Sequence, residues 1–133
     1  MMKFSRQSRL LKPAQFKVVF QQPIRSSDEF FRIMARNNGI QQNRLGMAVS
    51  KKACARAVGR NRIKRVIREN FRSVMLGPTS DNSLDIVVLP TAQAASQSNK
   101  TLDESLSNHW QKLTKKAGNR NIGIQPDQLR TQR

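Results

Sequence analysis

The sequence predicts a single domain of the α+β class, in which a few short strands and helices share one core. Three observations lead to this prediction. The chain has 133 residues, which is about the length of one domain. Three short segments alternate along the chain with the period of a strand. Three other segments place apolar residues three and four positions apart, which is the period of a helix.

The first helix is predicted to begin at Pro13, because proline suits the first position of a helix. Pro23 ends it, since proline cannot continue a helix. Phe16 and Phe20 lie on one face of this helix. Residues 1–12 carry four Lys or Arg side chains among polar residues, and we interpret them as a basic N-terminal arm.

Strands are predicted at residues 31–34 and 45–50, where apolar side chains occupy alternate positions. A turn signal at residues 37–39, Asn-Asn-Gly, separates them. We interpret these two strands as an antiparallel pair with one buried face. A third strand is predicted over residues 84–88 and is closed by Pro90.

A long helix is predicted over residues 58–75, and residues 91–100 are interpreted as a loop. Thr101 begins a capping-box spacing, so the last helix is expected to start there. The folded domain is placed at residues 13–116, and residues 117–133 are interpreted as a disordered basic tail. The apolar stripe of the last helix comprises Leu102, Leu106, Trp110 and Leu113.

The charge of the chain points to a polyanionic partner. Lys and Arg number 25 and Asp and Glu number 8, which gives a formal net charge of +17. An excess of this size excludes a typical small-molecule enzyme. A solvated basic face and an anionic membrane surface are the alternatives to a nucleic acid. A membrane is disfavoured because interfacial helices usually carry bulky apolar residues opposite the charge.

The cysteine and histidine counts and the hydropathy exclude further classes of protein. Cys54 is the only cysteine, so no intrachain disulfide can form, which fits a reducing cytoplasm. His109 is the only histidine, which excludes zinc fingers and HExxH metalloproteases. We interpret His109 as a helix-surface or packing residue. Residues 86–89 form an apolar run far too short for the ~20 residues that a membrane span needs.

Charge and apolar residues separate to opposite sides of the helix at residues 58–75. At 100° per residue, one arc is apolar and suited to a core. Like charges on the other arc follow at i, i+4 spacing, where each pair costs ~0.2–0.5 kcal/mol in an isolated helix. A polyanion would remove this repulsion. The apolar arc holds Ile63, Val66, Ile67 and Val74, with Phe71 at its edge. The opposite arc holds Asn61, Lys64, Arg65, Arg68 and Arg72.

Other functions remain open from the residues alone. Phe16 and Phe20 could belong to the core, or they could stack on unpaired bases. A general RNA-binding module shares the charge and the architecture. A nuclease active without RNA is disfavoured, because the carboxylates are scattered over unrelated elements and a two-metal site needs them to converge. Cys54 is not expected to act as a nucleophile.

Two segments resemble a known family. The run from Ala57 to Arg72 closely resembles the Arg-Asn-Arg signature helix of the bacterial ribonuclease P protein family. Residues 45–52, Leu-Gly-Met-Ala-Val-Ser-Lys-Lys, match the strand and loop that lead into that helix. Residues 9–12 with Phe16 and Phe20 are similar to the opening of the family. The resemblance spans Phe4 to Lys116.

The resemblance implies a small two-layer α/β sandwich in the order αβββαβα. A left-handed βαβ crossover would carry the signature helix, and a fourth short strand is expected within residues 22–29. In the family, RNA performs the catalysis and holds most of the Mg²⁺, and the protein binds no cofactor or metal by itself. The expected partners are the catalytic RNA, in a 1:1 complex with a monomeric protein, and the 5′ leader of precursor tRNA. No membrane partner is expected.

Site residues follow from the resemblance position by position. Arg62 lies off the main cationic arc, so its role is expected to differ. Met34 falls where relatives often carry an aromatic side chain on the floor of the leader cleft. The residues implied to contact the catalytic RNA are Lys51, Lys52, Arg56, Arg60, Asn61, Arg62, Lys64, Arg65, Arg68 and Arg72. Those implied to contact the leader are Phe16, Lys17, Phe20, Arg32 and Met34.

Overall fold

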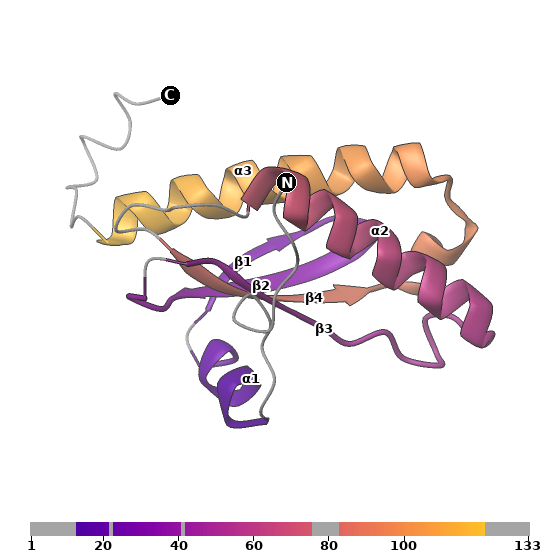
Figure 1. Cartoon of the computed structure of the whole chain (residues 1–133), viewed down its shortest axis with the longest axis horizontal. Coiled ribbons are helices and arrows are strands. Elements are labelled where there is room, and N and C mark those ends of the chain that lie inside the picture. Colours follow the sequence, from indigo (N-terminus) through magenta and orange to yellow (C-terminus); the bar gives the residue numbers. More distant parts are fainter. Residues whose placement is uncertain (1–12, 22, 41, 76–82, 122–133) are drawn as a thin grey trace.

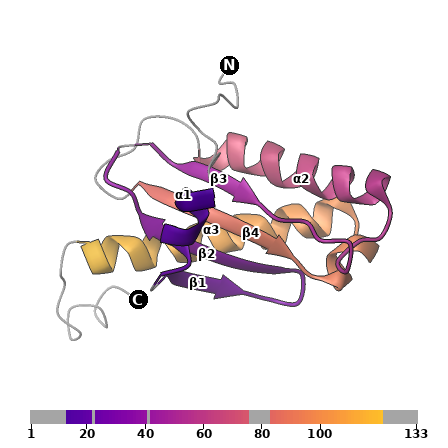
Figure 2. The ribbon, with the colours of Figure 1, turned by 90° about the horizontal axis from the view of Figure 1, so that it is seen from below.

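The computed structural model describes residues 13–21, 23–40, 42–75 and 83–121. A four-stranded sheet has α2 and α3 on one face and α1 on the other (Figures 1 and 2). The α+β class and the order αβββαβα are therefore confirmed, and β1 is the fourth strand expected within residues 22–29. The elements are α1 (Pro13–Val19), β1 (Ile24–Ser27), β2 (Phe31–Asn37), β3 (Arg44–Met47), α2 (Ala57–Met75), β4 (Leu84–Pro90), the 3₁₀ helix η2 (Ala92–Ser96) and α3 (Asn99–Asn121).

The order of the strands corrects one prediction. The sheet runs β1-β2-β4-β3, with β3 parallel to β4 and the other neighbours antiparallel. The predicted antiparallel pair of residues 31–34 and 45–50 is wrong, because β4 lies between them. Every residue of β4 from Leu84 to Val88 is buried. A strand covered on both faces is best placed in the middle of a sheet, and the four-residue β3 forms an edge.

The main core lies between the sheet and the helices α2 and α3. The rings of Phe71 and Trp110 meet edge to face with centroids 5.9 Å apart. Burying a large apolar side chain stabilises the fold by ~1.5–3 kcal/mol, so these contacts fix both helices on the sheet. The largest fully buried side chains are Trp110, Phe31, Phe71, Ile33, Leu45, Ile63, Ile67, Leu84, Ile86, Leu102, Leu106 and Leu113.

The apolar arc predicted for α2 is confirmed except in its last turn. Ile63, Val66, Ile67 and Phe71 are buried, but Val74 is 51% exposed. Met75 occupies the buried position instead. The helix end is fixed on that side, because Asn43 donates its side-chain amide to the Met75 carbonyl at 2.8 Å.

Helix α3 differs from its prediction at both ends. It begins at Asn99, because the Ser98 hydroxyl accepts the Thr101 N–H at 3.2 Å and so caps the helix earlier. The loop predicted for residues 91–100 contains η2 and this helix start.

The tail predicted to start at residue 117 is wrong for residues 117–121, which continue α3. Ala117 is buried in the main core, four residues after Leu113. A small alanine thus extends the apolar stripe that the larger residues define. The predicted arm at residues 1–12 and the predicted tail over residues 122–133 lie outside the described residues.

Candidate RNA interface

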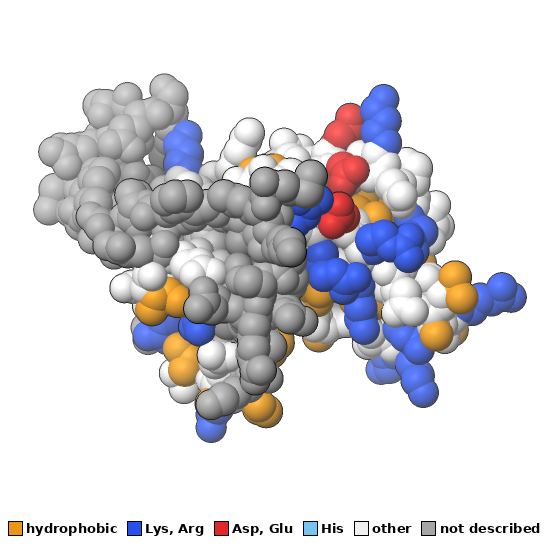
Figure 3. Space-filling view, in the orientation of Figure 1, with side chains coloured by type: hydrophobic (Ala, Val, Ile, Leu, Met, Phe, Trp, Pro, Cys, Tyr) orange, Lys and Arg blue, Asp and Glu red, His pale blue; other side chains and the backbone are white. Residues whose placement is uncertain are grey.

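The cationic arc of α2 lies on the outer side of the helix, opposite its buried residues. Asn61 and Arg65 are exposed, and Lys64 and Arg68 are half-buried. Lys and Arg side chains lie across the half of the molecule that α2 occupies, with a small group of Asp and Glu among them (Figure 3). The core therefore holds the backbone of α2 rigidly, while its polar arc faces outward.

Arg72 has a partner within the same helix. Its guanidinium lies 2.8 Å from the Glu69 carboxylate, one turn earlier. The hydrogen bond from Arg72 lowers the pKa of Glu69, and the same bond raises the pKa of Arg72. Glu69 is exposed and Arg72 is half-buried at the surface, so the pair adds little stability, but it moderates the positive charge at this end of the arc.

Two signature arginines are held by the protein itself. Arg60 donates to the carbonyls of Cys54 and Ala55, at 3.0 and 2.8 Å, and so fixes the loop before α2. Arg62 donates to the Asn99 side chain at 2.6 Å and to the Ala95 carbonyl at 3.2 Å. Its off-arc position thus directs it towards η2 and α3, and its contact with the catalytic RNA stays a prediction.

The loop before α2 presents the remaining cations predicted for this surface. Lys51, Lys52 and Arg56 are exposed. The Ser50 hydroxyl accepts the N–H of Ala53 at 3.1 Å, which holds the loop in a turn. Together with α2, this loop forms one continuous basic segment of chain.

A second surface lies on the other face of the sheet, beside α1. Val19 of α1 and Val87 of β4 are both buried there. Phe16 is half-buried and packs against this pair, as do Met34 and Leu89. Phe20 is 44% exposed. The two aromatic residues therefore differ in environment. Phe16 belongs in part to a small core, and Phe20 presents its ring to solvent.

Cationic side chains from both predicted sets line one open cavity on this surface. The cavity has a volume of about 310 Å³, and Arg32 and Lys52 both line it. Ser50, Thr91 and the apolar Leu89 complete much of its wall. Arg32 was expected to face the leader and Lys52 the catalytic RNA, so the fold brings the two sets together. Lys17 is exposed on α1.

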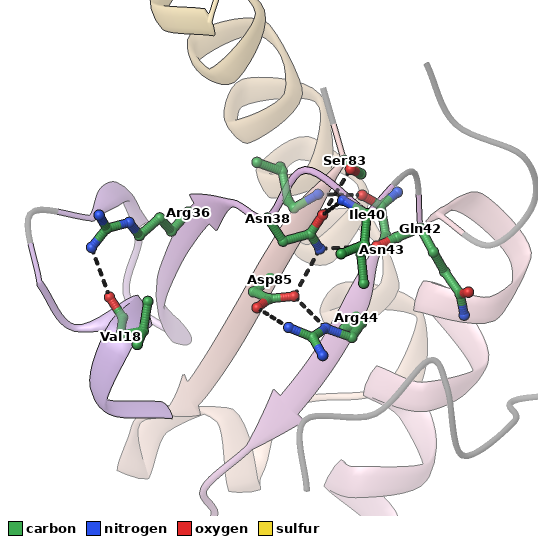
Figure 4. Close-up of polar contacts among 10 residues, drawn as sticks. Val18, Arg36, Asn38, Ile40, Gln42, Asn43, Arg44, Ser83 and Asp85 are labelled. Atoms are coloured by element: carbon green, nitrogen blue, oxygen red, sulfur yellow. Dashed lines mark hydrogen bonds and ion pairs between the residues drawn. The ribbon is translucent and has the colours of Figure 1, made fainter. Parts of the chain in front are cut away.

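Sequence reasoning missed Arg36. This β2 side chain reaches α1 and donates to the Val18 carbonyl at 3.1 Å (Figure 4). It also donates to the Gln21 carbonyl at 2.9 Å. In the sequence, Arg36 occupies the third alternate position of this strand that faces away from the main core, after Arg32 and Met34. Nothing in the spacing showed that a helix end lies above it.

Polar side chains meet in a cluster where α3 packs on β1, away from both surfaces, and all of them except Asp28 are buried. His109 is 1% exposed, with Nδ1 2.5 Å from the Ser26 hydroxyl and Nε2 3.1 Å from an oxygen of Asp28. His109 is thus a packing residue. Burial lowers its pKa, although Asp28 opposes this. Burial would raise the pKa of Asp28, but hydrogen bonds from Ser105 and from the N–H groups of Phe31 and Phe30 lower it overall.

No group of three or more His, Cys, Asp or Glu side chains that could hold a metal ion occurs among the described residues. Within the same ranges, no helix combines the length and the apolar character that crossing a membrane requires.

The fold and the surfaces define a small basic α+β protein whose cationic helix is built to face a polyanion. A model of the ribonuclease P family matches residues 4–114. The ribonuclease P protein components of Methylococcus capsulatus and Aliivibrio fischeri are each 40% identical to the chain, over 113 and 112 residues. These alignments cover 85% and 84% of this chain, and 86% and 93% of those proteins.

Solved structures of RNase P proteins are also similar to this chain. The RNase P protein of Staphylococcus aureus superimposes with a TM-score of 0.67 at 32% identity, covering 78% of this chain and 93% of that one. The RNase P protein of Thermotoga maritima gives 0.64 at 30% identity, covering 75% and 92%. The chain therefore belongs to the ribonuclease P protein family. It is a subunit of an endoribonuclease that processes the 5′ ends of tRNA.

Proposed function

We propose that the outward arc of α2 and the loop before it bind the catalytic RNA of ribonuclease P. The observation that carries this proposal is the separation on α2, where Arg65 and Asn61 face outward and Ile63 and Ile67 are buried. A rigid helix with this pattern holds its cations at fixed spacing. Binding along an RNA backbone would neutralise phosphates and release their counterions. Arg60 and Arg62 would act mainly by shaping the loop and fixing α2.

The surface beside α1 is proposed to bind the single-stranded 5′ leader of precursor tRNA. An exposed ring such as Phe20 can stack on an unpaired base, which contributes ~1–3 kcal/mol per base. Arg32 and Lys52 at the open cavity would neutralise leader phosphates. Met34 is partly buried against Val87 and would give the floor an apolar contact without aromatic stacking.

In this proposal the RNA subunit performs the cleavage and holds most of the Mg²⁺. The protein raises the affinity for substrates that carry a leader. Three of its carboxylates are already engaged, since Asp28 binds Ser105, Glu69 binds Arg72 and Asp85 binds Arg44. The protein is proposed to act as a monomer, bound 1:1 to RNA in the cytoplasm.

The decisive experiment is cleavage of precursor tRNA at low Mg²⁺ with a matched bacterial ribonuclease P RNA, with and without this protein. We expect cleavage at the mature 5′ end that requires both components. Binding of precursor and mature tRNA to the holoenzyme should differ, with the precursor bound more tightly. Equal affinity for the two would contradict leader binding, and cleavage by the protein alone would contradict the assignment of catalysis to RNA.

A further inference from the structure

We propose that Arg36 is a positioning residue whose hydrogen bonds to the end of α1 hold this helix over the sheet; we call these bonds the lock. Asp85 keeps Arg36 available for the lock because it binds Arg44 and not Arg36. The inference rests on the proposed leader surface for its effect on substrate. The lock itself is a property of the free protein and can be tested without RNA.

Helix α1 depends on contacts outside itself. It spans seven residues, whereas isolated helices shorter than ~12–15 residues are marginal in water. Val19 is its buried side chain. The carbonyls at a helix C-terminus lack partners within the helix. The Val18 carbonyl accepts the Gln21 N–H at 3.1 Å, and Arg36 adds a second donor there and a donor to the Gln21 carbonyl, both from a single guanidinium nitrogen. Its charge also complements the negative end of the helix dipole.

Arg36 is available to bind α1 because Asp85, the carboxylate opposite it in the sheet, is bound by another arginine. In the sheet register Asp85 lies directly opposite Arg36 on β2 and directly opposite Arg44 on β3. Opposite charges at such positions normally attract each other. Asp85 could therefore bind either arginine.

Asp85 is bound by Arg44 through both carboxylate oxygens. Arg44 donates from Nε at 2.7 Å and from a terminal nitrogen at 2.6 Å. Asn38 adds a third hydrogen bond to Asp85 at 2.8 Å (Figure 4). The hydrogen bonding to the Asp85 carboxylate raises the pKa of Arg44. A fork that fits both oxygens is a strong arrangement, and it leaves the Arg36 guanidinium to α1.

The arrangement has a consequence for the leader surface. Helix α1 carries Phe16, which packs beside Met34, and it leads directly into Phe20. Loss of Arg36 would free the end of α1 from which Phe20 projects. Loss of Arg44 would do the same indirectly, because the freed Asp85 would attract Arg36 away from the α1 carbonyls.

The test uses full-length Arg36→Ala and Arg44→Gln proteins and the double variant Arg44→Gln/Asp85→Asn. Amide hydrogen exchange in residues 13–20 of the free protein reports the lock. The preference of the holoenzyme for precursor over mature tRNA reports its use. We expect both single variants to exchange faster in α1 and to lose ~10-fold of the preference, as loss of a pair of charge-assisted hydrogen bonds implies. The double variant should recover, since a neutral amide at position 85 does not compete for Arg36.

Arg25→Ala is the matched control, because it removes an exposed cation from β1 and leaves the α1 contacts in place. Unchanged exchange in α1 of Arg36→Ala, or failure of the double variant to recover, would overturn the lock. Faster exchange in Arg36→Ala with an unchanged tRNA preference would support the lock and contradict leader binding by α1. A loss in Arg25→Ala equal to that in Arg36→Ala would reduce the effect to charge alone and overturn the positioning role.

Discussion

The thiol of Cys54 lies against the backbone of Gly59: a Cβ placed on Gly59 would stand 2.4 Å from Sγ. That separation is far below van der Waals contact, so a side chain at position 59 fits only if the Cys54 thiol or the loop that carries it moves. The relationship couples the shape of the basic loop to the start of the cationic arc.

Gly59→Ala should therefore destabilise the protein by ~1–3 kcal/mol, as over-packing does, and should weaken RNA binding. In a Cys54→Ala background the same change should stabilise it by up to ~1 kcal/mol, because alanine favours a helix over glycine. Thermal unfolding of the original protein, both single variants and the double variant measures both effects. The same sign in the two backgrounds would contradict the steric cause.

The buried His109 should make stability depend on pH. Burial lowers its pKa from the ordinary value of about 6.5, so the unfolded chain takes up this proton at a higher pH than the folded protein. The free energy of unfolding should fall as pH decreases below about 6.5. His109→Gln should flatten that part of the profile, which urea unfolding from neutral to mildly acidic pH measures. A profile equally steep in the variant would assign the pH dependence to other groups.

Asp28 should affect the stability of the fold at a lower pH than His109 does. Its pKa is below the ordinary value of 3.8, so its contribution is present above that value and is lost as pH falls through the folded pKa. A Ser105→Ala variant removes one of its hydrogen bonds and should lose stability earlier on acidification, which acid titration followed by circular dichroism measures. An acid limb identical to that of the original protein would exclude this role for Asp28.

Arg65 should contribute one phosphate contact. Arg65→Ala is expected to reduce the slope of log affinity against log salt by about 1 for the catalytic RNA, with unfolding unchanged. Arg62→Ala should instead lower stability, because its guanidinium joins α2 to Asn99 and Ala95. Lys115→Ala, an exposed cation on α3, is the control. A slope unaffected by Arg65→Ala would remove this residue from the interface.

The two phenylalanines of the α1 segment should separate in their effects. Phe20→Ala should weaken precursor tRNA binding more than mature tRNA binding and leave the melting temperature nearly unchanged, because the ring is 44% exposed. Phe16→Ala should lower both precursor affinity and melting temperature, since its ring packs on the Val19–Val87 pair. Val18→Ala, 48% exposed on the same helix, controls for lost apolar area. If Phe20→Ala and Val18→Ala behave alike, stacking is not the function of Phe20.

Periodicity in the sequence predicted the positions of helices and strands far better than it predicted which strands pair. The buried arc of α2 followed from the spacing of Ile63, Ile67 and Phe71, because a helix turns by a fixed angle per residue. The pairing of β3 with β4 could not be predicted in this way, since alternation shows which face of a strand is buried and nothing about its neighbour.

The same limit applies to the candidate site. The outward cations of α2 were predicted from their angles on the helix, and Arg62 was correctly set apart. Arg36 was missed because its importance depends on the end of α1, which only the tertiary fold brings above β2. Ser98 was missed as a cap because Thr101 offered the same chemistry three residues later.

The central position of β4 also constrains how a newly made chain can fold. β4 is the last of the four strands to leave the ribosome, yet both β2 and β3 pair with it and Val19 packs on it. Until Pro90 has emerged, only the β1–β2 hairpin can form its final pairing. The apolar side of α2 is synthesised before the strand that helps to cover it, so the nascent protein can complete its core only after β4 has emerged.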